Sequence, residues 1–134
     1  MERVAFQLRI RAGQELEYDR RHAAVWPELL EELRGFGVRE YSIFRRGQEL
    51  VLTLRVPDFA ELQRQLLGSE VNRRWQMYMA EVFEPVPSLR DGESLAVMEE
   101  VFYLPGWESA AATGGGRQVL NDGVGRDGAG SDGD

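Results

Sequence analysis

The chain has 134 residues, 43% of them hydrophobic, and carries a formal net charge of −7. It contains no cysteine, no lysine and one histidine, which excludes disulfides, thiolate catalysis and Schiff-base chemistry and argues against zinc or iron sites that use several histidines. Because the arginines are scattered among acidic residues and no apolar run reaches membrane-spanning length, we expect neither a nucleic-acid partner nor a membrane anchor.

The N-terminal segment alternates apolar and polar residues, which predicts a half-buried strand over residues 4–10. A signal peptide has a different pattern, so we expect a cytoplasmic protein. From about Glu15 the apolar residues recur at helical spacing, and glycines at 35 and 37 mark the end of this run. Pro27 lies inside the run, so it predicts a kink or the start of a second helix after His22.

Two further strands are predicted in the middle of the chain. Residues 38–45 alternate so that Tyr41 and Ile43 share one face, and residues 50–56 alternate in the same way. The connection at residues 45–48 contains a glycine, as expected of a hairpin turn.

The second half of the domain repeats the helix-then-strand order. Asp58 predicts the start of a helix through Leu67, and Ser69 predicts the start of another helix, which carries an apolar stripe. Residues 84–94 contain proline and glycine and predict a loop, and residues 95–104 predict the last strand.

This β-α-β-β-α-β order is that of the α+β, ferredoxin-like fold class. A single antiparallel sheet with helices on one face leaves the other face bare, so we expect two copies to associate as a dimeric α+β barrel, a homodimer. We expect the functional domain at residues 1–105. Residues 106–134 hold nine of the fifteen glycines and −3 of the net charge, which predicts a flexible Gly/Asp-rich tail in which only Trp107 could dock.

The single histidine stands among aromatic residues. Tyr18 and His22 are neighbours at i, i+4, and Trp26 follows at the next turn. A histidine exchanges protons near neutral pH, and aromatic rings with a few polar groups form plausible sugar pockets, to which Tyr41 and Trp75 could contribute. Spacing alone does not exclude a purely structural role for these residues. A lone histidine often simply packs in the protein, and Tyr41 and Trp75 also fit core positions.

Four segments of the chain together resemble the L-rhamnose mutarotase family. They are "YDRRHAAVWPEL" at residues 18–29, "YSIF" at 41–44, "RRWQMYM" at 73–79 and "EVFYLP" at 100–105. They occur in the family's order and with near-family spacing, and the resemblance extends from about Val4 to Pro105.

The resemblance implies a dimeric, ferredoxin-like enzyme that interconverts the α and β anomers of L-rhamnose in rhamnose metabolism without a cofactor or metal. It places the family's proton donor on His22 and its sugar-binding tyrosines on Tyr18 and Tyr41. The family's tandem tryptophans fall on Trp75 and Gln76, so both are expected to bind substrate. Gln76 departs from the family pattern, which leaves the exact sugar open.

Ring opening needs one proton placed on the ring oxygen and one removed from the anomeric hydroxyl, and we expect His22 to handle one of them. Tyr18, Tyr41, a bound water or a carboxylate of the partner subunit could handle the other. Three alternative functions remain at this point: a mutarotase for another 6-deoxy sugar, a haem-binding protein or monooxygenase on the same dimeric fold, and a non-catalytic sugar-binding module.

Overall fold

The computed structural model describes residues 1–106. Residues 1–100 form one unit, and the chain from residue 101 onward belongs to a second. Trp107 and the rest of the predicted tail lie outside the described residues, so the domain boundary expected at residue 105 stays a prediction.

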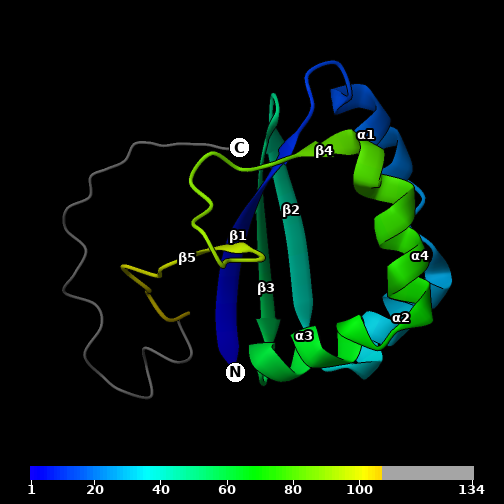
Figure 1. Cartoon of the computed structure of the whole chain (residues 1–134). Coiled ribbons are helices and arrows are strands. Elements are labelled where there is room, and N and C mark those ends of the chain that lie inside the picture. Colours follow the sequence, from blue (N-terminus) through cyan, green and yellow to red (C-terminus); the bar gives the residue numbers. More distant parts are fainter. Residues whose placement is uncertain (107–134) are drawn as a thin grey trace. The chain divides into compact units, whose positions relative to one another are not determined.

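One antiparallel sheet forms the framework of the first unit. Its order is β2 (Glu40–Arg46), β3 (Glu49–Val56) and β1 (Glu2–Ile10), and the free edge of β1 pairs with two short strands, β4 (Phe83–Glu84) and β5 (Ala96–Met98). β1 and β3 therefore lie in the middle of the sheet, and all the strands that pair with β1 are far from it in the chain (Figure 1).

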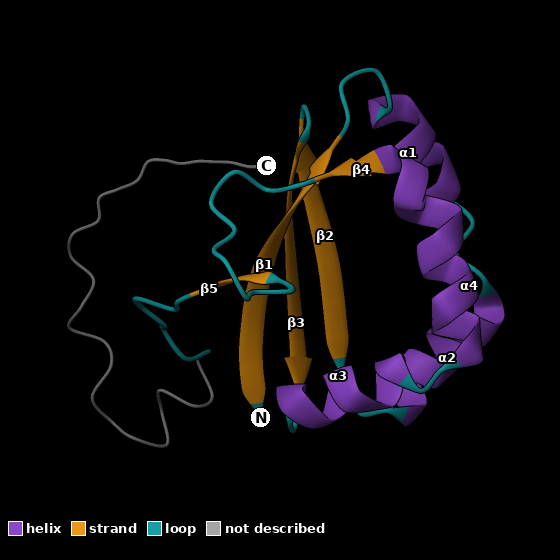
Figure 2. Cartoon of the chain, viewed as in Figure 1, coloured by secondary structure: helices purple, strands orange, loops and turns teal. Residues whose placement is uncertain are grey.

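The helices lie on one side of this sheet (Figure 2). The first helical segment consists of α1 (Glu15–His22) and α2 (Pro27–Gly35), and the second consists of α3 (Phe59–Leu67) and α4 (Glu70–Met79), followed by a 3₁₀ turn. The order is thus β-α-β-β-α-β with each helical segment divided in two, which confirms the predicted α+β fold class.

The alternation of the strands places the core between sheet and helices. Phe6 pairs with Leu52, and Tyr41 pairs with Leu54, so these side chains share the helix-facing side of the sheet. The largest fully buried side chains are Ile10, Leu50, Val56, Leu62, Met79 and Val82. Strands and helices contribute to this set together, so burial of one apolar surface stabilises both layers.

Three local signals in the sequence set the helix boundaries as predicted. The Asp58 side chain accepts a hydrogen bond from the Glu61 amide at 3.1 Å, and the Ser69 hydroxyl accepts one from the Asn72 amide at 3.0 Å. Pro27 is the first residue of α2, where a missing N–H costs nothing, so the apolar run divides into two helices.

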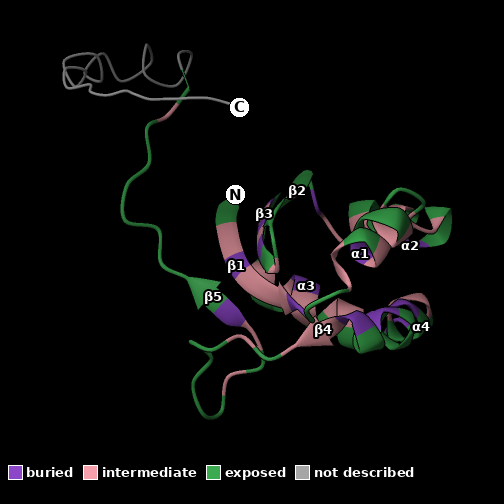
Figure 3. Ribbon diagram, turned by 90° about the horizontal axis from the view of Figure 1, so that it is seen from above, coloured by how far each residue is buried: buried purple, intermediate pink, exposed green. Residues whose placement is uncertain are grey.

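The prediction of a last strand over residues 95–104 is wrong in its length. β5 covers only Ala96–Met98, and β4, which the sequence did not predict, occupies the edge of β1 beside Arg9 and Ile10. Along β5 only Ala96 is buried, and the rest is exposed (Figure 3). Beyond it, Glu100 contacts β1 through its side chain, by two hydrogen bonds of 2.8 Å from Arg3.

Candidate active site

His22 is positioned by the break between the first two helices. It is the last residue of α1, and α2 begins at Pro27 after the extended residue Trp26, whose ψ is 128°. His22 is half-buried there and lines the same pocket as Trp75 of α4 and Ile43 of β2.

Aromatic contacts fix the orientation of the His22 ring. Tyr18 stacks on it with the ring centroids 4.2 Å apart and an interplanar angle of 25°. Trp75 meets it edge-on at 5.4 Å, and Trp26 in turn meets Trp75 edge-on at 5.1 Å. A ring held from two sides has few alternative rotamers, which is the condition for precise proton transfer.

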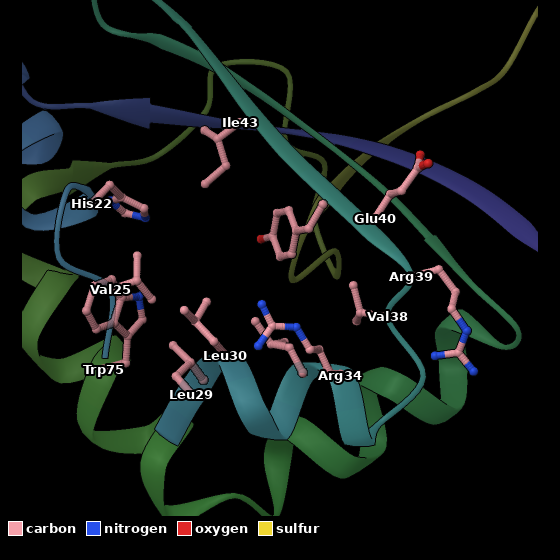
Figure 4. A pocket seen from close by; sticks show the side chains of 12 residues that line it. His22, Val25, Leu29, Leu30, Arg34, Val38, Arg39, Glu40, Ile43 and Trp75 are labelled. Atoms are coloured by element: carbon pink, nitrogen blue, oxygen red, sulfur yellow. The ribbon is translucent and has the colours of Figure 1, made fainter. Parts of the chain in front are cut away.

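The His22 ring faces a pocket of about 340 Å³ between β2 and the helices (Figure 4). Three of the predicted site residues meet here from three different elements: His22 from α1, Tyr41 from β2 and Trp75 from α4. The other lining residues are Val25, Leu29, Leu30, Leu33, Arg34, Val38, Arg39, Glu40 and Ile43. Apolar walls with a few polar groups are typical of small-molecule sites.

Burial shifts the pKa values of the three titratable aromatic groups. It lowers the pKa of His22 below its usual 6.5, although the Tyr18 carbonyl oxygen at 3.4 Å from Nδ1 and the charge of Asp19 oppose the change. Burial also raises the pKa of Tyr41 to about 12 and that of Tyr18 well above its usual range. At neutral pH the site therefore holds an uncharged imidazole and two protonated phenols.

Tyr18 is not among the residues that line the pocket, but it borders the pocket through its stack on His22. Its side chain is 3% exposed, and within residues 1–106 its hydroxyl has no hydrogen-bond partner. The charge that Tyr41 would carry contributes to the raised pKa of Tyr18, so the two phenols are close enough to interact. A buried hydroxyl normally has a partner, and one without a protein partner beside a pocket is suited to a ligand.

The structure does not bring Gln76 to the pocket. It is exposed on α4, and its amide donates to the Asn72 side chain at 3.3 Å. Consecutive residues of a helix point about 100° apart, so the burial of Trp75 turns Gln76 toward another side of the helix. The substrate-binding role predicted for Gln76 stays a prediction.

Sequence reasoning missed two charged contributors to the site. Arg34 lines the pocket from α2, and Asp19 accepts two hydrogen bonds of 2.8 and 2.6 Å from Arg45. That pair ties α1, which carries His22, to β2, which carries Tyr41. Charge spacing along one helix gives no signal for a pair formed with a strand.

Residues 1–106 contain neither a metal-binding cluster nor a membrane-spanning helix. No group of three or more His, Cys, Asp or Glu side chains there could hold a metal ion, and no helix there has the length and apolar character to cross a membrane. The prediction of a reaction without metal or cofactor stays a prediction.

Fold and pocket together define a small α+β protein with a rigidly held, uncharged histidine in an aromatic pocket. This is an arrangement for moving protons on a small polar ligand. Comparison with known proteins identifies the family.

The sequence model of the L-rhamnose mutarotase family matches residues 3–104. An L-rhamnose mutarotase from Burkholderia orbicola is 39% identical over 106 residues, which cover 78% of this chain and 99% of the relative. One from Bacteroides thetaiotaomicron is 36% identical with the same coverage. The chain belongs to the L-rhamnose mutarotase family, which makes it a carbohydrate isomerase and confirms the resemblance found in the sequence.

Solved structures agree with this assignment. The crystal structure of an L-rhamnose mutarotase from Formosa agariphila matches with a TM-score of 0.64 and 32% identity, covering 78% of this chain and 100% of that chain. A tetracenomycin F2 cyclase from Streptomyces glaucescens matches with a TM-score of 0.53 and 21% identity, covering 79% and 99%. The second likeness concerns the fold alone.

Proposed function

We propose that this chain interconverts the α and β anomers of L-rhamnose in the pocket beside His22, as part of rhamnose metabolism. The observation that carries the proposal is the meeting of His22, Tyr41 and Trp75 at one pocket of about 340 Å³, in a member of the L-rhamnose mutarotase family. A pyranose offers apolar C–H faces to aromatic walls and hydroxyls to the polar groups among them.

His22 starts the reaction as a base. Because burial lowers its pKa, the imidazole is uncharged at neutral pH and can take the proton of the anomeric hydroxyl. The C1–O1 bond then becomes a carbonyl, the bond between C1 and the ring oxygen breaks, and the ring oxygen takes up a proton. Reclosure on the other face of C1 reverses each transfer, and His22 returns its proton to O1. The donor role that the family resemblance implies for His22 corresponds to this return.

Tyr41 supplies the second proton in this scheme. It lines the same pocket as His22, and its pKa of about 12 keeps the phenol protonated through the physiological range. Tyr18 supports the His22 ring by stacking and offers its hydroxyl to the sugar. Trp75 orients the sugar with the part of its indole that lines the pocket.

Saturation-transfer NMR on the anomeric protons of L-rhamnose tests the proposal, with L-fucose, D-glucose and D-galactose as comparison sugars. We expect faster exchange for L-rhamnose, and a loss of about 10²–10⁴-fold in His22→Gln. Arg20→Gln is the matched control, since Arg20 lies on the same helix with its side chain 66% exposed. Full activity in His22→Gln would remove His22 from the mechanism.

The same spectra separate the remaining functions. Acceleration for a different sugar would keep the mechanism and change the substrate, and Gln76→Trp would then test whether position 76 determines that choice. Binding of sugar without acceleration would indicate a binding module. A cytoplasmic location stays a prediction from the sequence.

We also propose that the enzyme is a homodimer that associates through the sheet face opposite the helices. The strand register places two uncharged rows across the middle of this face. One row contains Phe44, Val51, Gln7 and Ala96, and the other contains Ser42, Thr53, Ala5 and Met98.

Charged rows border this uncharged centre on both sides. Glu40, Arg55 and Arg3 form one row, in which Arg55 lies 3.5 Å from Glu40. Glu49, Arg9 and Glu84 belong to the other row, in which Arg9 pairs with Glu84 at 2.6 Å. An uncharged centre with a charged rim is the usual composition of a protein interface. Phe44, with 64% of its surface exposed, is the bulky side chain of the centre.

Sedimentation velocity tests the homodimer. We expect a dimer for the wild type and a monomer for Phe44→Asp. The control is Leu67→Asp, which places the same charge at an 87% exposed leucine on α3, away from this face. A monomeric wild type, or a dimer that persists in Phe44→Asp, would contradict this interface.

A further inference from the structure

Arg34 reaches into the pocket from the side opposite His22. It lies in the last turn of α2, and its guanidinium extends toward the middle of the pocket (Figure 4). The side chains of its charged neighbours Arg39 and Glu40 extend away from the pocket in the same view. Arg34 is therefore the charged side chain that a ligand in this pocket would meet.

The direction of Arg34 departs from what its own helix would favour. Three other arginines pair with the glutamate three residues earlier: Arg20 with Glu17, Arg64 with Glu61 and Arg73 with Glu70. Such i, i+3 pairs stabilise a helix slightly.

Glu31 stands three residues before Arg34, so the same pair is available. Within residues 1–106, however, no ion pair or hydrogen bond joins the two side chains, and the Arg34 guanidinium has no other protein partner there. The chain thus keeps a donor group in the pocket that no described protein acceptor satisfies.

We propose that Arg34 is a specificity-determining residue that binds the hydroxyl oxygens at C3 and C4 of the sugar. This inference rests on the proposed function, because that function places C1 and the ring oxygen beside His22. In a pyranose, C3 and C4 form the edge opposite C1 and the ring oxygen. A sugar with its reacting edge at His22 therefore turns its C3–C4 edge toward the side from which Arg34 enters.

The chemistry of the guanidinium fits two neighbouring hydroxyls. It presents N–H donors in a rigid planar fork and has no acceptor, so it can donate to both oxygens at once. Because these oxygens take no part in the reaction, their contacts persist unchanged during ring opening. Arg34 should therefore strengthen binding of the ground state and the transition state equally, which affects KM and not kcat.

Kinetics with L-rhamnose and 4-deoxy-L-rhamnose test this role. In the wild type, removal of the C4 hydroxyl should raise KM about tenfold. Arg34→Gln should raise KM for L-rhamnose about tenfold at nearly unchanged kcat and should bind both sugars alike. Arg34→Lys, which keeps the charge and loses the fork, should fall between the two.

Arg64→Gln is the matched control. Arg64 also lies in the last turn of its helix, three residues after a glutamate, but it pairs with that glutamate and lies outside the pocket lining. Its variant should behave as the wild type does with both sugars. Tryptophan fluorescence gives the dissociation constant of each sugar independently of turnover, since Trp75 lines the pocket.

The outcomes separate this inference from the proposed function. An unchanged KM for L-rhamnose in Arg34→Gln overturns the role of Arg34. A KM increase on removal of the C4 hydroxyl that is equally large in Arg34→Gln and in the wild type also overturns it. A wild type that binds L-rhamnose without accelerating anomer exchange overturns the proposed function, while its dissociation constants still test Arg34. A folded wild type that binds neither sugar overturns both.

Discussion

Replacing Tyr18 by phenylalanine should make the protein more stable and less active. The ring is 3% exposed and stacks on His22, and phenylalanine keeps this packing. What the substitution removes is a buried hydroxyl that has no hydrogen-bond partner within residues 1–106. Its pKa lies well above the usual range because of burial and the nearby Tyr41, so the group removed is a neutral phenol.

The size of both effects follows from the hydroxyl. A buried polar group without a partner costs about 1–3 kcal/mol, so its removal should raise the free energy of unfolding by about 1 kcal/mol. For a folded unit of 100 residues, this corresponds to an increase in Tm of about 4 °C. If the hydroxyl binds the sugar with one neutral hydrogen bond, its loss should raise KM about fivefold.

Urea unfolding and anomer-exchange kinetics on the same preparation measure both quantities. Tyr18→Leu serves as a comparison, because it removes the stack on His22 along with the hydroxyl and should lower stability and kcat together. If Tyr18→Phe proves less stable than the wild type with an unchanged KM, the hydroxyl has a protein partner, and its assignment to the sugar is wrong.

Three further predictions concern the surroundings of the site. Burial lowers the pKa of His22 in the folded state, so the unfolded chain binds a proton more readily than the folded protein does. The free energy of unfolding should therefore fall as pH drops through and below 6.5. Urea unfolding across this range should show a smaller loss of stability in His22→Gln. Asp19→Asn and Arg45→Gln should show a small favourable coupling in a double-mutant cycle, since the partly exposed pair joins α1 to β2. Complete additivity would mean that the pair contributes nothing. Gly37→Ala should cost about 2 kcal/mol in thermal unfolding, because φ is +107° there and the added Cβ would lie 3.2 Å from the Pro57 ring; a neutral result would show that this turn relaxes.

Local signals in the sequence were sufficient for most of the secondary structure. Asp58 and Ser69 cap helices through their own neighbours, and Pro27 starts a helix because of its own ring, so none of these depends on distant residues. The last strand was harder to predict, because β5 ends at Met98 although β1 continues to Glu2, while β4 pairs with the other end of β1 at Arg9 and Ile10. The alternation of a segment does not tell how far its backbone pairs with a distant strand.

Sequence spacing likewise predicted some contacts of the candidate site and not others. The spacing of Tyr18 and His22 on one helix predicted their contact, and the stack at 4.2 Å agrees with it. The spacing of Tyr41 predicted only which face of the strand it occupies and favoured the core. In the structure 40% of its surface is exposed and it lines the pocket, because β2 is the edge strand at which the helices leave room.

The sequence by itself therefore determined the order of the elements, the helix caps and the aromatic neighbours of His22, since each depends on residues within about one helical turn. Only the tertiary structure decided which side chains surround the pocket. Arg34 and Arg64 have the same local pattern, a glutamate three residues earlier in the last turn of a helix, yet one faces the pocket and the other pairs with its glutamate. That difference is set by what packs across from each helix, and contacts between elements distant in the chain are invisible to local spacing.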